Sequence, residues 1–317
     1  PKGHQKKRHS PCGWRFCPRS SRACEMRPLS GLAAQAILAH PKTNDPLFRT
    51  IEEVHERLGC QWGHILDAGT GGHSLKWLAT LPTPSVQRIT AVSADVSSGE
   101  GKGAHELRGK LDASRGDVLV EGAWCTLNRE PIVEAGSVDT IVCDYLIGSM
   151  DGFTPFEQDS LLETLVPRLS PHGLIHVVGL NPVYALLGET GYQKLSGGEQ
   201  VVVDAARCRD ACILLAAHRP YREFPASWVV RQLEKNGLQV VLPWKSFGVV
   251  WKLETVQRQL DVARRKLPHF GDATLSAAMK LQLDAISDRA RELIPAGGII
   301  YSHDYVISAR RPEEMTN

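Results

Sequence analysis

The sequence predicts an α/β fold built on a mostly parallel sheet. Short apolar, strand-like segments alternate with amphipathic helical segments, which is the order of βαβ units. One strand, at 64–67, runs directly into a glycine-rich turn and a helix. The last strand-like segment, 299–309, alternates apolar and polar residues, as antiparallel strands do. The 317 residues are 42% hydrophobic and 23% charged, proportions that exclude collagen-like, coiled-coil and wholly disordered chains.

The first half of the chain contains four strand–helix alternations. A helix is expected at 47–58, because its apolar residues recur at steps of three and four. Strands are then expected at 64–67, 88–94, 138–143 and 174–178. The helices between them are expected at 73–81, near 104–111 and at 155–169, with a turn at 171–173.

The second half is richer in helix. LSGGEQ at 195–200 resembles an ATPase signature, but no phosphate-binding G-x-x-x-x-G-K-[ST] accompanies it, so we interpret it as a capped helix start. Further helices are expected at 225–236 and over most of 253–293, with breaks at Pro268 and Gly271. A strand is expected within 238–251, before the final strand at 299–309.

Positive charge is concentrated at the start of the chain. Residues 1–30 carry eight Lys and Arg against one acid, so residues 31–317 carry a formal charge of −5. A body of that sign disfavours binding to a phosphate backbone, and nucleic acid is not an expected partner of the folded part. We expect a basic leader at 1–40 that is disordered or a targeting remnant, one domain at 41–310 and a tail at 311–317.

The cysteines indicate neither a disulfide framework nor a metal site. None of the eight forms a C-x-x-C pair, and no H-E-x-x-H occurs. We therefore expect reduced thiols, no metal and an intracellular, cytoplasmic location, with an organelle as the alternative if the leader is a transit segment. No stretch approaches the roughly 18 apolar residues of a membrane-spanning helix. The oligomeric state is not predicted.

The segment ILDAGTGGHSLKWL carries the most chemical information. A strand delivers Asp67 to the turn Ala68, Gly69, Thr70 and Gly71, and a helix follows at once. Glycines permit a left-handed backbone and let a ligand lie against the main chain. A dinucleotide fingerprint would continue with a third glycine, where this chain has Ser74.

This segment resembles motif I of class I S-adenosylmethionine-dependent methyltransferases. The resemblance implies a Rossmann-like, seven-stranded sheet with an antiparallel last strand, helices on both faces and helical inserts that cap the substrate side. It also implies a cofactor half near 60–180, a substrate half near 181–310, and S-adenosylmethionine as cofactor. Asp67 would then face the cofactor's ammonium group. The usual third glycine of the motif is His73 here.

Later segments resemble the family's other landmarks in the expected order. The acid that takes the ribose hydroxyls would be Asp95, although Ser93 occupies the expected position. The third motif would be Gly116, Asp117 and Val118, with its acid near the adenine. Asp144 and Tyr145 stand where the fourth motif ends, and no Asn/Asp-Pro-Pro-Tyr/Phe of amino-directed nucleic-acid enzymes occurs there.

The acceptor is expected above the loops 147–154 and 181–223, because ligands of open α/β sheets lie at the carboxyl ends of the strands. A small-molecule O, N or S nucleophile is the favoured acceptor. A protein or RNA substrate and a non-catalytic interaction module are the alternatives. Methyl transfer needs alignment more than a dedicated base. Asp151, Tyr184 and Tyr221 are the weak catalytic candidates.

Overall fold

The computed structural model describes residues 43–83, 85–94, 106–122, 133–183 and 187–313. The predicted leader, the predicted site residues Asp95 and Tyr184 and the start of the predicted helix at 104 lie outside these ranges. No helix of the described residues is long and apolar enough to cross a membrane.

The described strands form one sheet in the order β3-β2-β1-β4-β5-β8-β6, and β7 also pairs with β8. Neighbouring strands among the first five, β1 through β5, pair in parallel. Strand β8 runs antiparallel to β5. The strands are β1 (Gly63–Asp67), β2 (Val86–Ser93), β3 (Val118–Glu121), β4 (Val138–Asp144), β5 (Leu169–Leu180), β6 (Gln239–Val240), β7 (Lys245–Trp251) and β8 (Ile299–Arg310). The predicted Rossmann-like sheet with an antiparallel last strand is confirmed.

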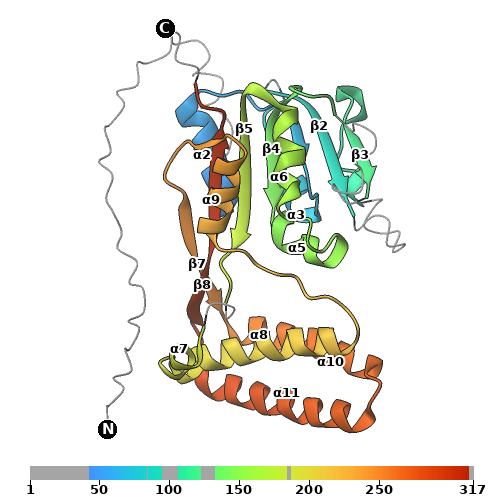
Figure 1. The fold of residues 1–317 in the computed structure, drawn as a ribbon, viewed down its shortest axis with the longest axis vertical. Helices are drawn as coiled ribbons and strands as arrows, with labels where there is room; N and C mark the ends of the chain where they lie inside the picture. The colour runs from blue at the N-terminus through green and yellow to red at the C-terminus, as the bar shows by residue number, and fades with distance from the viewer. Residues whose placement is uncertain (1–42, 84, 95–105, 123–132, 184–186, 314–317) are drawn as a thin grey trace, which may run out of the picture.

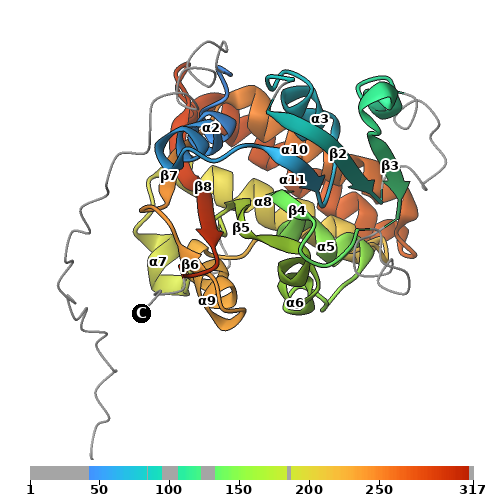
Figure 2. The same ribbon diagram turned by 90° about the horizontal axis from the view of Figure 1, so that it is seen from above.

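Helices cover both faces of the sheet, as Figure 2 shows. On one face lie α2 (Pro46–Leu58) and α3 (Gly72–Leu78), which share a buried hydrophobic cluster with β1 and β2. On the other lie α5 (Leu146–Phe153), α6 (Ser160–Leu165) and α9 (Ala226–Lys235), in a second cluster. The start of α2 is well specified, because the Asp45 carboxylate accepts hydrogen bonds from the first amides of the helix.

A separate helical layer faces the carboxyl ends of the parallel strands (Figure 1). It consists of α7 (Glu189–Gln193), α8 (Gly197–Leu215), α10 (Leu253–Lys266) and α11 (Ala273–Leu293). The last three pack around their own core, which includes Val202, Leu260 and Ile286. The Ser196 hydroxyl and the Glu199 carboxylate cap the start of α8 reciprocally, so the interpretation of LSGGEQ as a helix start is confirmed.

Three predicted elements differ from the structure. The predicted loop 147–154 is mostly helix α5, whose two glycines gave a weak helix signal. The predicted turn 171–173 is an irregularity within β5, where the register against β4 shifts. The predicted sixth strand is divided into β6 and β7, both of which pair with β8.

A buried chain of hydrogen bonds links α2 to the sheet. His55 Nδ1 lies 3.3 Å from the carbonyl oxygen of Cys60, so this nitrogen donates. His55 Nε2 then accepts from His176 Nε2 at 3.1 Å, and His176 Nδ1 accepts from the Ser308 hydroxyl at 2.8 Å. Both rings are neutral, because burial lowers the pKa of His55 to about 4 and that of His176 well below its usual value.

Acidification should therefore act on the fold through this pair. Between pH 6.5 and about 4, the unfolded chain binds a proton at His55 that the folded chain does not. The free energy of unfolding, relative to that of His55→Phe, should fall by about 1.4 kcal/mol per pH unit in this window. Urea unfolding of both proteins at pH 7, 6, 5 and 4.5 measures the difference. Parallel stability curves would contradict the neutral pair.

Candidate functional site

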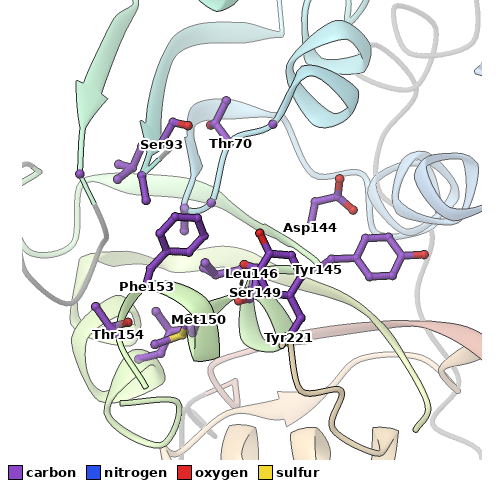
Figure 3. A pocket seen from close by; sticks show the side chains of 17 residues that line it. Thr70, Ser93, Asp144, Tyr145, Leu146, Ser149, Met150, Phe153, Thr154 and Tyr221 are labelled. Atoms are coloured by element: carbon purple, nitrogen blue, oxygen red, sulfur yellow. Dashed lines mark hydrogen bonds between the residues drawn. The ribbon is translucent and has the colours of Figure 1, made fainter. Parts of the chain in front are cut away.

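A cavity of about 200 Å³ opens at the carboxyl ends of β1 to β4 (Figure 3). It lies where the strand order reverses, between β1 and β4, which is where open α/β sheets bind ligands. The lining residues come from the ends of four strands, from helix α5 and its C-terminal cap, from helix α6 and from the segment before α9. They are Ala68, Gly69, Thr70, Gly71, Val92, Ser93, Ala94, Gly122, Asp144, Tyr145, Leu146, Ser149, Met150, Phe153, Thr154, Leu161 and Tyr221.

The two glycines of the turn, Gly69 and Gly71, matter because they lack a side chain and not because they adopt a left-handed backbone conformation. A Cβ on Gly69 would lie 2.6 Å from Cδ1 of Leu146, so the absence of a side chain lets the turn pack against the first residue of α5. Gly71 has φ −120° and ψ 175°, an extended conformation open to any residue. A Cβ on Gly71 would meet no described atom within 4 Å and would enter the space beside the turn.

Asp67 lies beneath this turn and does not line the cavity. Its carboxylate is fully buried, and Oδ2 accepts a hydrogen bond of 2.8 Å from the Ser74 hydroxyl at the start of α3. Burial raises the pKa of Asp67 to about 7. Oδ2 of Asp67 thus supports the turn, whereas Oδ1 is buried without a hydrogen-bond partner among the described residues, and the predicted contact with a cofactor ammonium stays a prediction.

Ser93, the alternative to Asp95, is at the cavity. It ends β2 and is buried, and its hydroxyl has no hydrogen-bond partner among the described residues. The same is true of Thr154 Oγ1 and of Asp144 Oδ1, also in the cavity wall. Buried polar atoms are normally paired, so three unpaired oxygens around one cavity are consistent with a polar ligand.

Asp144 and His73 contact each other at the edge of the cavity. Nδ1 of His73 lies 3.5 Å from Asp144 Oδ2, and its Nε2 lies 3.1 Å from Asp45 Oδ2. The Asp144 contact, reinforced by Asp45, raises the pKa of His73 above its usual value. His73, at the position of the third glycine in the motif that this segment resembles, therefore links Asp45 at the N-cap of α2 to Asp144 at the end of β4.

Tyr145 lies at the cavity wall in an unusual conformation. Its φ of 50° is left-handed, which is uncommon for a residue other than glycine and marks a sharp change of direction after β4. In Figure 3 its ring points away from Ser149. Burial and the nearby Asp304 carboxylate raise the pKa of Tyr145, which keeps the phenol protonated.

The third predicted motif lies at the amino ends of the strands, opposite the cavity. Gly116, Asp117 and Val118 precede or begin β3, so they lie at its amino end and do not line the cavity. The Asp117 carboxylate pairs with Arg115 at 2.7 Å and accepts from the amide of Ile89 at 2.8 Å. This arrangement is structural. Gly122, just after β3, lines the cavity instead.

The catalytic candidates differ in position. Tyr221 lines the cavity, whereas Asp151 points away from it into a buried contact with Gln158 and Arg219. Sequence reasoning placed the segment 147–154 near the acceptor but took it for a loop, so it named none of Ser149 and Phe153 on α5 or Thr154 at its C-terminal cap as site residues. The apolar spacing of Leu146, Met150 and Phe153 was the available signal for a helix.

Comparisons with known proteins give structural neighbours only. No family model matches the chain, and no curated protein matches its sequence.

In the described residues, no group of three or more His, Cys, Asp or Glu side chains is placed to hold a metal ion.

The solved structures that the chain resembles include S-adenosylmethionine-dependent methyltransferases. Phosphoethanolamine N-methyltransferase 2 of Haemonchus contortus, with phosphomonomethylethanolamine and S-adenosylhomocysteine, has 14% identity and a TM-score of 0.43. The match covers 89% of this chain and 56% of that one, so the chain spans little more than half of its length.

Two further neighbours are of similar size to this chain. A cyclopropane synthase from Mycobacterium tuberculosis is 16% identical over 83% of this chain and 84% of its own, with a TM-score of 0.43. A methyltransferase from Geobacter sulfurreducens, also with S-adenosylhomocysteine, is 14% identical over 87% and 94%, with a TM-score of 0.40. The fold class itself rests on the strand order described above.

The structural role of Asp117 is testable by unfolding. Asp117→Ala should lower the free energy of unfolding by about 3 kcal/mol, because it leaves Arg115 without its buried partner. Asp159→Ala is the matched control: this exposed acid makes no capping hydrogen bond and should change stability by less than about 0.5 kcal/mol. Equal effects of the two changes in urea unfolding would contradict the assignment.

Proposed function

We propose that this chain is an S-adenosylmethionine-dependent methyltransferase that acts on an O, N or S atom of a small molecule. The observation that carries the proposal is the cavity at the β1/β4 switch point, walled by a glycine turn and by unpaired polar oxygens. When bound, S-adenosylmethionine would supply an electrophilic methyl group on a positively charged sulfur.

The residues present fit this cofactor. Its cationic groups suit the acidic side of the cavity, where Asp144 and the buried Asp67 lie. The ribose hydroxyls suit Ser93, which ends the strand next to the turn and has an unpaired hydroxyl oxygen. The open space beside Gly71 would let the ligand lie against the main chain.

The surroundings of the cavity favour a small-molecule acceptor. The helical layer stands over the carboxyl ends of the strands, and residues 216–225 run from α8 back to α9 between this layer and the sheet (Figure 1). An acceptor held there would be aligned by the inner face of α5 and by Tyr221, and alignment alone contributes substantially to transfer between bound groups. The negative charge of residues 31–317 disfavours a nucleic-acid acceptor.

Calorimetric titration with S-adenosylmethionine and S-adenosylhomocysteine tests the proposal. Both should bind at one site, and Gly71→Val should weaken binding at least tenfold because the new side chain enters the ligand space. Gly271→Val is the matched control. Its Cβ also meets no described atom within 4 Å, but Gly271 is outside the cavity, so its affinity should stay that of the unaltered chain. A folded protein that binds neither ligand would contradict the proposal and favour an interaction module.

Affinity for the cationic cofactor should rise with pH. Since the pKa of Asp67 is about 7 in the free protein, a bound cation nearby would favour the ionised carboxylate and release its proton. Binding of S-adenosylmethionine should tighten by up to about tenfold from pH 6 to pH 8. Asp67→Asn, which cannot ionise at this position, should reduce the increase in affinity between pH 6 and pH 8. An unchanged slope in Asp67→Asn would exclude Asp67 as the linked group.

A further inference from the structure

Three exposed aromatic side chains belong to the cavity wall or to the residues that directly follow it in the chain. Phe153 is 40% exposed, Phe156 73% and Tyr221 52%; we call these three residues the aromatic rim. Phe153 and Tyr221 line the cavity itself, and Figure 3 shows the Phe153 ring projecting from α5 towards Ser93 and Thr70. Scattered exposed apolar residues are ordinary, but grouped ones at a cavity mark binding surfaces.

The rim is held in place by the backbone around it. The Tyr221 ring lies on Gly152, where an added Cβ would be 2.9 Å from Cε1, and its centroid is 6.4 Å from that of Phe153. Phe156 has a left-handed φ of 72°, a strained conformation for a residue with a bulky side chain. The chain thus presents a ring to solvent at a conformational cost, and such strain tends to accompany function.

A guanidinium group accompanies the rings. Arg219 lies 5.1 Å from the centre of the Phe156 ring, and its Nε donates to the carbonyl oxygen of Asp151 at 3.1 Å. Asp151 Oδ2 lies 3.6 Å from the same guanidinium, whose side chain is still 43% exposed. Arg222 follows in the same segment, is also exposed and anchors it through its amide to the carbonyl oxygen of Gly148 at 3.1 Å.

The two sides of the site carry different charged groups. The side formed by β1 and β4 is acidic, with Asp67, Asp144 and the nearby Asp45. The side formed by α5 and residues 219–223 carries Arg219, Arg222 and the aromatic rim, together with the acids Asp151 and Glu223. A cationic cofactor suits the first side. The second side suits an anion with a flat apolar body, since arginine recognises anions and stacks on rings.

We propose that the methyl acceptor is a planar aromatic molecule with an anionic group, whose ring stacks on the aromatic rim and whose charge lies at Arg219. This rests on the proposed function, because it names the substrate class of the same site. Phe156 and Arg219 would be specificity-determining residues, neither of which lines the cofactor cavity.

Titration with defined probes, at saturating S-adenosylhomocysteine, tests the proposal. The probes are 2-naphthoate, its saturated counterpart decahydro-2-naphthoate and the neutral 2-naphthalenemethanol. We expect 2-naphthoate to bind at least tenfold more tightly than either of the others. Phe156→Gly, which removes the ring and relieves the strained backbone, and Arg219→Gln should each weaken 2-naphthoate binding about tenfold.

Two variants serve as matched controls. Trp244→Leu removes another exposed ring, and Arg291→Gln removes another exposed guanidinium, both outside the rim. Neither should change 2-naphthoate binding. If S-adenosylhomocysteine binds but 2-naphthoate shows no preference, or the rim variants match the controls, the acceptor class is wrong and the proposed function stands. If S-adenosylhomocysteine does not bind, the proposed function fails and the acceptor assignment with it.

Discussion

The site depends on the close packing of the 68–71 turn against Leu146. This contact brings the loop after β1 and the helix after β4 together at the point where the strand order reverses. A Cβ at position 69 would lie 2.6 Å from Leu146 Cδ1, so any side chain there would displace Leu146. Both the turn and helix α5 line the cavity.

Glycines also allow close packing at helix α5, which lines another part of the cavity. Within α5, Gly148 lies against the Glu223 carboxylate and Gly152 against the Tyr221 ring. Residues 221–223 can therefore cross the helix at close range, although both glycines weaken it as an isolated helix. The cost is offset by tertiary contacts, among them the buried Leu146 and Met150 on the same helix.

Burial sets the electrostatics on both sides of the cavity. It raises the pKa of Asp67 and of Glu223 to about 7, so each carboxyl group can exchange a proton near neutral pH. By contrast, burial keeps His55 and His176 neutral. The hydrogen-bond chain from the Cys60 carbonyl oxygen to the Ser308 hydroxyl fixes which nitrogen of each ring carries the proton. Groups that titrate near neutrality thus adjoin the cavity, while a neutral polar chain joins α2 to the sheet.

The sequence by itself determined the fold class, because hydrophobic periodicity and the glycine turn are local signals. It also located Gly69, Thr70, Gly71, Asp144, Tyr145 and Tyr221, which the structure brings to one cavity. Tertiary structure decided what local patterns do not encode. Asp117 looked like a ligand-binding acid, but strand direction puts it at the opposite edge, on Arg115. Helix α5 was taken for a loop because its two glycines weaken the helical signal, and only its packing against residues 221–223 shows why those glycines are there.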